Sequence, residues 1–217
     1  MRGGVGGCEP PGAIKSHPLT NRPLTGLTHL GRLEATTPLK RGIRLLSYHP
    51  NSMSALTLIG MPGSGKSTIG KLIAHQLGWN FVDLDILILE KTSVSHDKIL
   101  DEQGQEALLK LENDLTVELP FTNLVFSPGG SIIYSQEAME KIKHESKIIY
   151  LELPLTEIQR RLGNNADNSR GIVDFKEKGY VGLYTERTPV YERYAHHIIP
   201  CLDLDITTIV ERVLRHV

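Results

Sequence analysis

The chain has 217 residues, of which 40% are hydrophobic and 23% charged, and its formal net charge is −1. This composition is ordinary for a soluble globular protein, and the length suits one domain, or one domain with a tail. No apolar run approaches the roughly 18 to 20 residues that a bilayer requires, so we expect no membrane association. The two cysteines, Cys8 and Cys201, are far apart and lack metal-ligand spacing, which excludes a disulfide framework and a zinc site. We therefore expect a reducing, cytoplasmic location.

Residues 1–52 differ in composition from the rest of the chain. They are rich in Gly, Pro and Thr, and residues 1–53 carry seven Lys or Arg against two acidic residues, whereas the remainder is net acidic. Prolines interrupt any element and there is no sustained apolar period, so we predict a disordered segment. The predicted organisation is an N-terminal extension over 1–53, disordered or mis-assigned, and one domain over 54–217.

Three interpretations of this extension are open. The favoured one is a stretch translated from a misassigned start codon, with Met53 the true start, because a strand begins almost immediately after it. A transit peptide comes second, since the segment is basic and poor in acids, although its prolines weaken an amphipathic helix. A nucleic-acid-binding arm comes last, because the charges are sparse and lack interleaved aromatic residues, so we expect no nucleic-acid partner.

From residue 54 onward, short apolar runs alternate with segments of helical period. Strands are predicted at 55–59, 81–84, 123–126, 147–151 and 197–199. Helices are predicted at 66–77, 86–91, 97–103, 105–119, 136–144, 155–162, 176–194 and 206–215. A mobile polar loop is expected at 163–174, and a helix break near Pro189. Short strands separated by helices indicate crossover units, and hence an α/β fold with a five-stranded parallel sheet and helices on both faces.

The segment Gly60–Thr68 matches the pattern G-x-x-x-x-G-K-[ST] between a predicted strand and a predicted helix. Its glycines let backbone N–H groups turn inward around an anion, and the helix N-terminus adds positive potential. Lys66 is expected to reach the β- and γ-phosphates, and the Ser67 hydroxyl to bind Mg²⁺. The residues predicted to bind nucleotide are Gly60, Gly63, Ser64, Gly65, Lys66, Ser67 and Thr68. The sequence therefore predicts a protein that binds a nucleoside triphosphate with Mg²⁺.

Two aspartates, Asp83 and Asp85, end the second predicted strand. Strand ends beside the phosphate loop face the ligand crevice, so Asp83 is a candidate Mg²⁺ ligand, acting through water. Asp85 points to the same side by the period of two and is a candidate to orient or deprotonate a substrate hydroxyl. The alternative for Asp85 is a helix cap.

Further candidates are scattered along the chain. Gly129 and Gly130 follow the third strand and permit close approach of backbone to a small ligand, or form an ordinary turn. Arg170 lies in the polar loop, where it would close over a transferring phosphate, unless the loop is merely solvated. Arg187 is a candidate ligand for a substrate anion, the alternative being a salt bridge with Glu186 or Glu192.

The pair Arg160 and Arg161 ends a predicted helix, where cations favour the helix dipole and either could stack on adenine. Together with the loop, the aspartates, the Gly-Gly turn and the lid arginine, this set resembles the shikimate kinase family over about residues 54–217. The segment formed by Arg187, Pro189, Val190 and Tyr191 also fits the family pattern. The resemblance implies a three-layer P-loop kinase fold with strand order 2-3-1-4-5 and a lid.

The resemblance also implies the residues' roles. Lys66 and Ser67 would serve phosphate and Mg²⁺, Asp83 the metal, and Asp85 the substrate hydroxyls. Arg170 would be the lid arginine, Arg187 the ligand of the substrate carboxylate, and Arg161 a nucleotide contact, with Lys66, Asp85 and Arg170 the catalytic set. The implied activity is ATP- and Mg²⁺-dependent phosphorylation of a small-molecule hydroxyl, with shikimate the leading acceptor, in aromatic amino acid biosynthesis, by a monomer.

The chain departs from the family pattern on the acceptor side. The family has Gly-Glu-x-x-Phe-Arg-x-x-Glu before the third strand, and that Arg binds the shikimate carboxylate, but Leu109 occupies its position. Lys110 is adjacent but points elsewhere on a helix. Ser131 replaces a third glycine, and Gly171 a proline after the lid arginine. A kinase for another hydroxy acid or polyol, and a catalytically weak nucleotide-binding protein, are therefore the alternatives.

Overall fold

The computed structural model describes residues 54–163 and 171–217. They form a three-layer α/β domain whose five parallel strands have the order β2-β3-β1-β4-β5, as expected. The strands are β1 (Ala55–Ile59), β2 (Asn80–Asp83), β3 (Leu124–Ser127), β4 (Lys147–Glu152) and β5 (His197–Pro200). The helices are α1 (Lys66–Leu77), α2 (Leu84–Thr92), α3 (His96–Gln103), α4 (Gln105–Glu118), the 3-10 turn η1 (Ile132–Tyr134), α5 (Gln136–Glu145), α6 (Leu155–Leu162), α7 (Phe175–Tyr194) and α8 (Ile206–Leu214).

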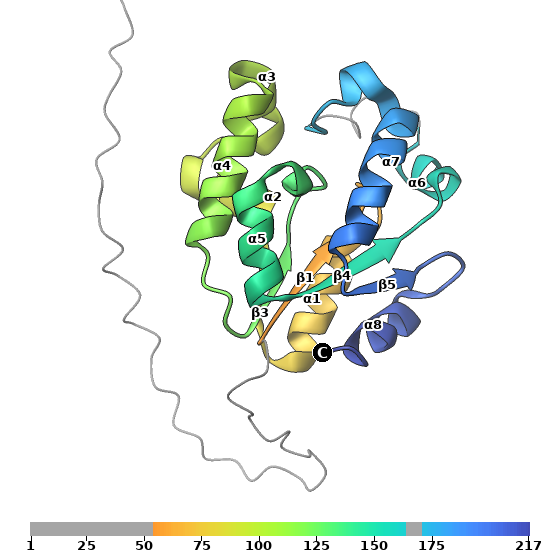
Figure 1. Ribbon diagram of the computed structural model, residues 1–217. Coiled ribbons are helices and arrows are strands. Elements are labelled where there is room, and N and C mark those ends of the chain that lie inside the picture. The colour runs from red at the N-terminus through yellow and green to blue at the C-terminus, as the bar shows by residue number, and fades with distance from the viewer. Residues whose placement is uncertain (1–53, 164–170) are drawn as a thin grey trace, which may run out of the picture. The chain divides into compact units, whose positions relative to one another are not determined.

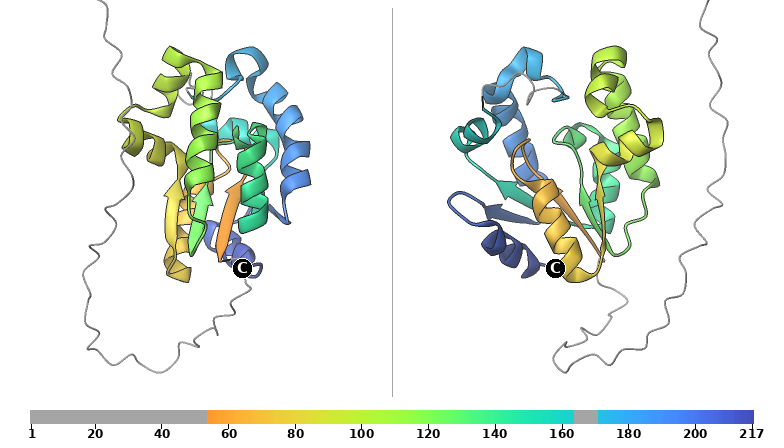
Figure 2. Two further views of the ribbon diagram at one scale, coloured as in Figure 1. Left: turned by 60° about the vertical axis from the view of Figure 1, so that its left-hand side comes forward. Right: turned by 180° about the vertical axis from the view of Figure 1, so that it is seen from behind.

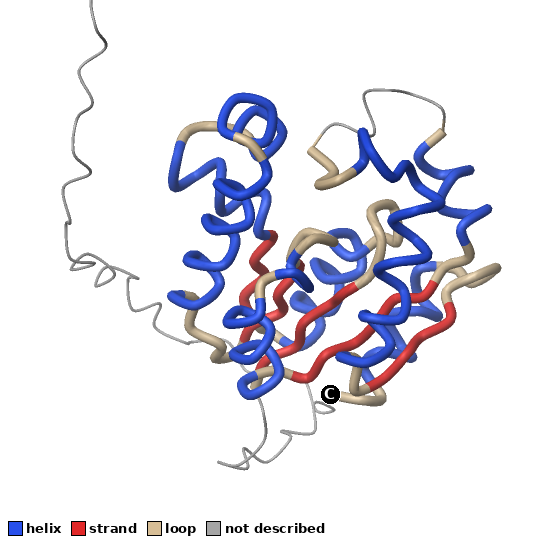
Figure 3. The backbone as a smooth tube through the Cα atoms, turned by 45° about the horizontal axis from the view of Figure 1, so that its top comes forward, coloured by secondary structure: helices blue, strands red, loops and turns tan. Residues whose placement is uncertain are grey.

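Helices cover both faces of the sheet (Figures 1 and 3). On one face α1 packs against β3 and α8, and on the other α5 and α7 pack against β4, with α4 beside α5 (Figure 2). The central strand β1 is buried along its whole length, as expected for a parallel strand covered on both faces. None of the described helices is long and apolar enough to span a bilayer.

The register of the sheet places the functional segments at one edge. Leu56 of β1 lies opposite Val125 of β3 on one side and Lys147 of β4 on the other. Strand β1 is therefore the central strand of the sheet. Asp83 of β2 lies opposite Ser127 of β3. The carboxyl ends of β1, β2 and β3 therefore open at the same edge, where ligands bind in doubly wound sheets.

Two predicted details of the secondary structure are wrong. The break in the long helix is not at Pro189, which keeps helical backbone angles, but at Gly179, with φ 59° and ψ −174°. Glycine adopts a positive φ without the steric penalty of a side chain, so the backbone strain of the break is lowest at Gly179. Helix α2 also begins at Leu84, two residues earlier than predicted, and this changes the geometry of Asp85.

Candidate active site

The glycine loop joins β1 to α1, as its sequence predicts. Gly60, Gly63 and Gly65 adopt φ values of 146°, 81° and 95°, which disfavour any residue with a side chain. A Cβ atom on Gly60 would lie 2.9 Å from the carbonyl oxygen of Leu151, so the loop also needs glycine there for space. The loop therefore has the backbone geometry of an anion cradle before the N-terminus of a helix.

Lys66 lies at the mouth of this loop. Its Nζ donates hydrogen bonds to the carbonyl oxygens of Gly60 at 3.0 Å and Met61 at 3.2 Å. Burial lowers the pKa of Lys66 to about 8, against the opposing attraction of Asp85 and Asp83. A lysine held in a low-dielectric site beside the loop is a strong electrostatic partner for a phosphate group.

The other loop residues divide into buried and exposed ones. Ser64 is buried and its hydroxyl has no hydrogen-bond partner among the described residues, whereas Thr68 is exposed on the first turn of α1. Of the two arginines at the end of α6, the structure brings Arg161 to the loop, with its Nη1 3.4 Å from the carbonyl oxygen of Gly63. Arg160 pairs with Glu157 at 2.7 Å and its side chain is 73% exposed.

Beside the loop, oxygen ligands converge where a metal ion would be needed. The Ser67 hydroxyl donates a hydrogen bond to Asp83 Oδ2 at 2.5 Å, so an alcohol oxygen and a carboxylate oxygen already lie side by side. Hard cations such as Mg²⁺ prefer oxygen ligands of this kind. These two residues fit the predicted metal, and they would hold it at the phosphate end of the site.

The structure corrects the expected geometry of the two aspartates. Asp83 is the N-cap of α2, and its Oδ1 accepts a hydrogen bond from the backbone N–H of Asp85 at 3.1 Å. Asp85 is thus in the first turn of a helix, not two residues along the strand, and the capping residue is Asp83 rather than Asp85. The Asp85 carboxylate is exposed to the cavity but closely surrounded by protein, so desolvation raises its pKa, which the nearby His96 opposes.

A cavity of about 270 Å³ connects the loop to a second set of side chains. Its lining includes Lys66, Ser67, Asp83, Asp85, His96, Gly129, Gly130, Ser131, Gly171 and Arg187. The structure therefore brings the phosphate loop, the aspartates, the Gly-Gly turn and Arg187 together. Arg170 lies outside the described residues.

Arg187 is buried at the end of this cavity, with 1% of its surface exposed. Its Nη2 donates to the carbonyl oxygen of Val173 at 2.8 Å and its Nε to the Tyr134 hydroxyl at 3.2 Å. No carboxylate pairs with it in the part of the chain that the structure describes, because Glu186 binds Lys178 at 2.7 Å instead. A buried guanidinium without an acidic partner is suited to an anionic ligand.

The Gly-Gly turn brings its backbone against Arg187. A Cβ atom on Gly130 would lie 3.0 Å from the Tyr191 hydroxyl and 3.1 Å from Arg187 Nη1. The Tyr191 hydroxyl donates a hydrogen bond to the carbonyl oxygen of Gly130 at 2.7 Å. A Cβ atom on Gly129 would lie 3.0 Å from Glu112 Oε1. Both glycines are thus positions where neighbouring side chains leave little room for a Cβ atom.

The position of the expected substrate arginine is occupied by a core residue. Leu109 on α4 is half-buried and packs against the hydrophobic core. Lys110 points away, as predicted, with a side chain that is 75% exposed and paired with Asp114 at 2.6 Å. The acceptor end therefore lacks the guanidinium that the family pattern would supply from α4.

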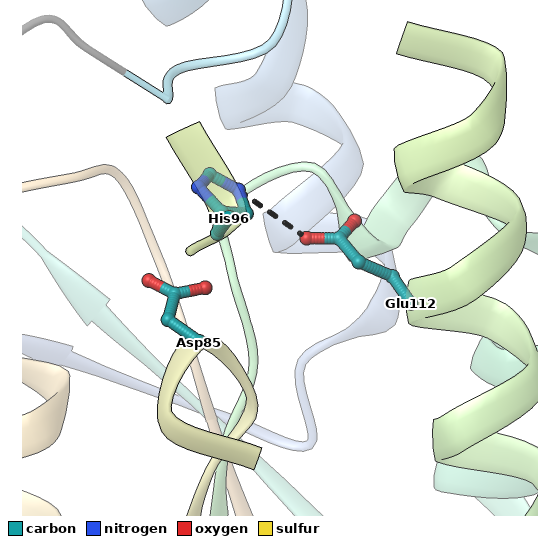
Figure 4. Close-up of side chains that lie close together, drawn as sticks. All are labelled: Asp85, His96 and Glu112. Atoms are coloured by element: carbon teal, nitrogen blue, oxygen red, sulfur yellow. Dashed lines mark ion pairs between the residues drawn. The ribbon is translucent and has the colours of Figure 1, made fainter. Parts of the chain in front are cut away.

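Sequence reasoning missed two residues of this site, Glu112 and His96 (Figure 4). Glu112 is fully buried on α4 and accepts a hydrogen bond from the Ser131 hydroxyl at 2.9 Å. Desolvation is the main reason that its pKa is raised to about 7. His96 Nε2 lies 3.8 Å from Glu112 Oε1. Glu112 is the final Glu of the family segment Gly-Glu-x-x-Phe-Arg-x-x-Glu, so its place in the site could have been predicted from that pattern. The sequence around His96 has no motif that would mark it as a site residue.

Known proteins share this architecture and this sequence pattern. The family model described as shikimate kinase matches residues 62–217. A shikimate kinase of Nostoc punctiforme is 36% identical over 146 residues, which cover 66% of this chain and 79% of that protein. One from Clostridium botulinum is 33% identical over 143 residues, covering 65% and 84% respectively. The solved structure of shikimate kinase from Acinetobacter baumannii in complex with shikimate matches with 26% identity and a TM-score of 0.65, covering 75% of this chain and 91% of that one. With its five-stranded sheet, glycine loop and family match over most of its length, the chain belongs to the shikimate kinase family.

Proposed function

We propose that this protein transfers the γ-phosphoryl group of ATP to a hydroxyl group of shikimate, giving shikimate 3-phosphate on the route to the aromatic amino acids. The observation that carries the proposal is one cavity that is lined both by Lys66 of the glycine loop and by the buried Arg187, which no carboxylate of the described residues pairs with. A cavity of this kind suits a triphosphate facing a small carboxylic acid that bears hydroxyl groups. The names of the relatives and the shikimate in the Acinetobacter baumannii structure support the same acceptor.

The phosphate end would act by positioning and charge. The backbone N–H groups of the loop and Lys66 would hold the β- and γ-phosphates, and Arg161 would contact the nucleotide from α6. Ser67 and Asp83 would hold Mg²⁺, which when bound neutralises charge on the β- and γ-phosphate oxygens. We propose that Arg170 closes over this end as the lid arginine.

The acceptor end would bind shikimate and orient one hydroxyl. The Asp85 carboxylate, raised in pKa by desolvation, would accept the proton of the attacking hydroxyl or orient it. Arg187 would bind the acceptor carboxylate, while Gly129 and Gly130 let the backbone approach the ring closely. Because Lys66 and Asp85 line the same cavity, the hydroxyl and the transferred phosphoryl group can meet there.

The test is a coupled ADP-release assay with ATP and Mg²⁺ on shikimate and, for comparison, gluconate. We expect turnover with shikimate. We also expect Arg187→Lys to raise the KM for shikimate by about tenfold or more, because a lysine cannot make the bidentate contact, while the KM for ATP is unchanged. The matched control is Arg193→Lys, an exposed arginine on the same helix. Tight ATP binding without turnover of shikimate would refute the proposal.

A further inference from the structure

The acceptor end of the cavity has fewer positive groups than its proposed substrate suggests. Among the described residues that line the cavity, the lysine and arginine side chains are those of Lys66, at the phosphate loop, and Arg187. Leu109, at the position of the family's substrate arginine, is half-buried against the core and has no polar group to donate a hydrogen bond. The question is which group, if any, supplies the second contact to an acceptor carboxylate.

The geometry of α4 shows where that contact would be. Residues three positions apart on a helix are neighbours, so an arginine at position 109 would lie beside Glu112. In this chain the basic group beside Glu112 comes from another helix instead. His96, in the first turn of α3, places its Nε2 3.8 Å from Glu112 Oε1, and the Asp85 carboxylate lies close to both (Figure 4).

The other departures from the family pattern lie around the same pair. Ser131, in place of a glycine, donates its hydroxyl to Glu112 at 2.9 Å. Gly171, in place of a proline, has φ 77°, and a Cβ atom there would lie only 2.6 Å from His96 Nδ1. The chain therefore lacks an arginine at position 109, has Ser131 as a hydrogen-bond donor to Glu112, and has Gly171 where a side chain would collide with His96.

We propose that His96, beside Glu112, is the second acceptor-binding residue of this pocket and takes the place of the guanidinium that Leu109 lacks; this rests on the proposed function. The side chain of His96 is 16% exposed and lines the cavity, so its imidazole can reach a ligand. At 3.8 Å the contact with Glu112 is longer than a hydrogen bond, so Nε2 of His96 remains available to a ligand. The acceptor carboxylate would bind between Arg187 and His96, which line the same cavity.

Steady-state kinetics on His96 variants test this role. His96→Leu keeps a similar volume and removes the polar group, and we expect the KM for shikimate to rise by roughly tenfold or more, with the KM for ATP unchanged. His96→Gln keeps an N–H donor, and its KM for shikimate should fall between those of the wild type and His96→Leu. His144→Leu, an exposed histidine on α5, is the matched control and should behave as the wild type.

A rescue experiment separates recognition from general damage to the pocket. In the double variant His96→Leu with Leu109→Arg, the guanidinium returns beside Glu112, and we expect most of the lost affinity for shikimate to return. Thermal melts of each variant check that the fold is kept, and the single His96 variants decide the matter if the double variant is unstable. An unchanged KM for shikimate in His96→Leu, with normal wild-type turnover, overturns the role of His96 alone. Absence of wild-type turnover overturns the proposed function and this inference with it.

Discussion

The buried carboxylate of Glu112 should make the stability of this protein depend on pH. Its ordinary pKa of 4.5 is raised to about 7, mainly because the fully buried side chain is desolvated; Asp85 adds to the effect, whereas Ser131 and Arg187 oppose it. Between these two values the folded protein holds a proton that the unfolded chain has released. The stability that protonated Glu112 contributes is therefore fully present below pH 4.5 and is lost as the pH rises through about 7.

The size of the effect follows from the pKa difference. A rise from 4.5 to about 7 corresponds to about 3 kcal/mol of unfolding free energy, lost in full above pH 8. Glu112→Gln removes the titration but keeps an oxygen that accepts the Ser131 hydroxyl. We expect the variant to gain about 2.5 kcal/mol relative to the wild type between pH 5 and pH 8. His96 and Asp85 are the other titratable groups that face this carboxylate.

Urea denaturation at pH 5, 6, 7 and 8 measures this difference. Plots of unfolding free energy against pH for the wild type and Glu112→Gln should diverge as the pH rises, with the variant the more stable above pH 7. Glu118→Gln replaces an exposed carboxylate on the same helix and controls for the change of residue type. Parallel curves for the wild type and Glu112→Gln would refute the conclusion that burial controls this carboxylate.

Two further substitutions test the cavity. Gly130→Ala places a methyl group about 3 Å from the Tyr191 hydroxyl and Arg187 Nη1. We expect the KM for shikimate to rise several-fold and the unfolding free energy to fall by about 1 to 3 kcal/mol. An unchanged KM and melting temperature would show that the turn can accommodate a Cβ atom at this position. Asp83→Asn keeps the cap on α2 but removes the negative charge beside Ser67. We expect the Mg²⁺ concentration for half-maximal activity to rise about tenfold, and an unchanged Mg²⁺ dependence would remove Asp83 from the metal site.

The features that the sequence predicted well are those whose physical causes are local. The glycine loop is one contiguous segment, and its positive φ angles follow from residue type alone. The parallel sheet follows from short apolar strands separated by helices, and the order β2-β3-β1-β4-β5 from the family pattern. Residue ranges shifted by only a few positions, because frayed ends are weakly specified.

Errors arose where two local preferences competed. Pro189 and Gly179 both favour a break in α7, and only the packing of the helix shows that the chain bends at the glycine. Asp83 and Asp85 both suit a strand end or a helix cap. The structure assigns the cap to Asp83, which moves Asp85 into the first turn of α2 and changes the direction from which its carboxylate faces the cavity.

By itself, the sequence determined the phosphate end of this protein, because Gly60–Thr68 carries the loop, the helix N-terminus, Lys66 and Ser67 within a few residues. Only the tertiary structure decided the acceptor end, whose lining residues come from α2, α3, α7 and the turn after β3. Whether Arg187 meets an acidic partner, and whether a histidine approaches Glu112, depends on how distant helices pack. No periodicity or spacing along the chain encodes such contacts, since the energy that fixes them comes from burial of the whole core.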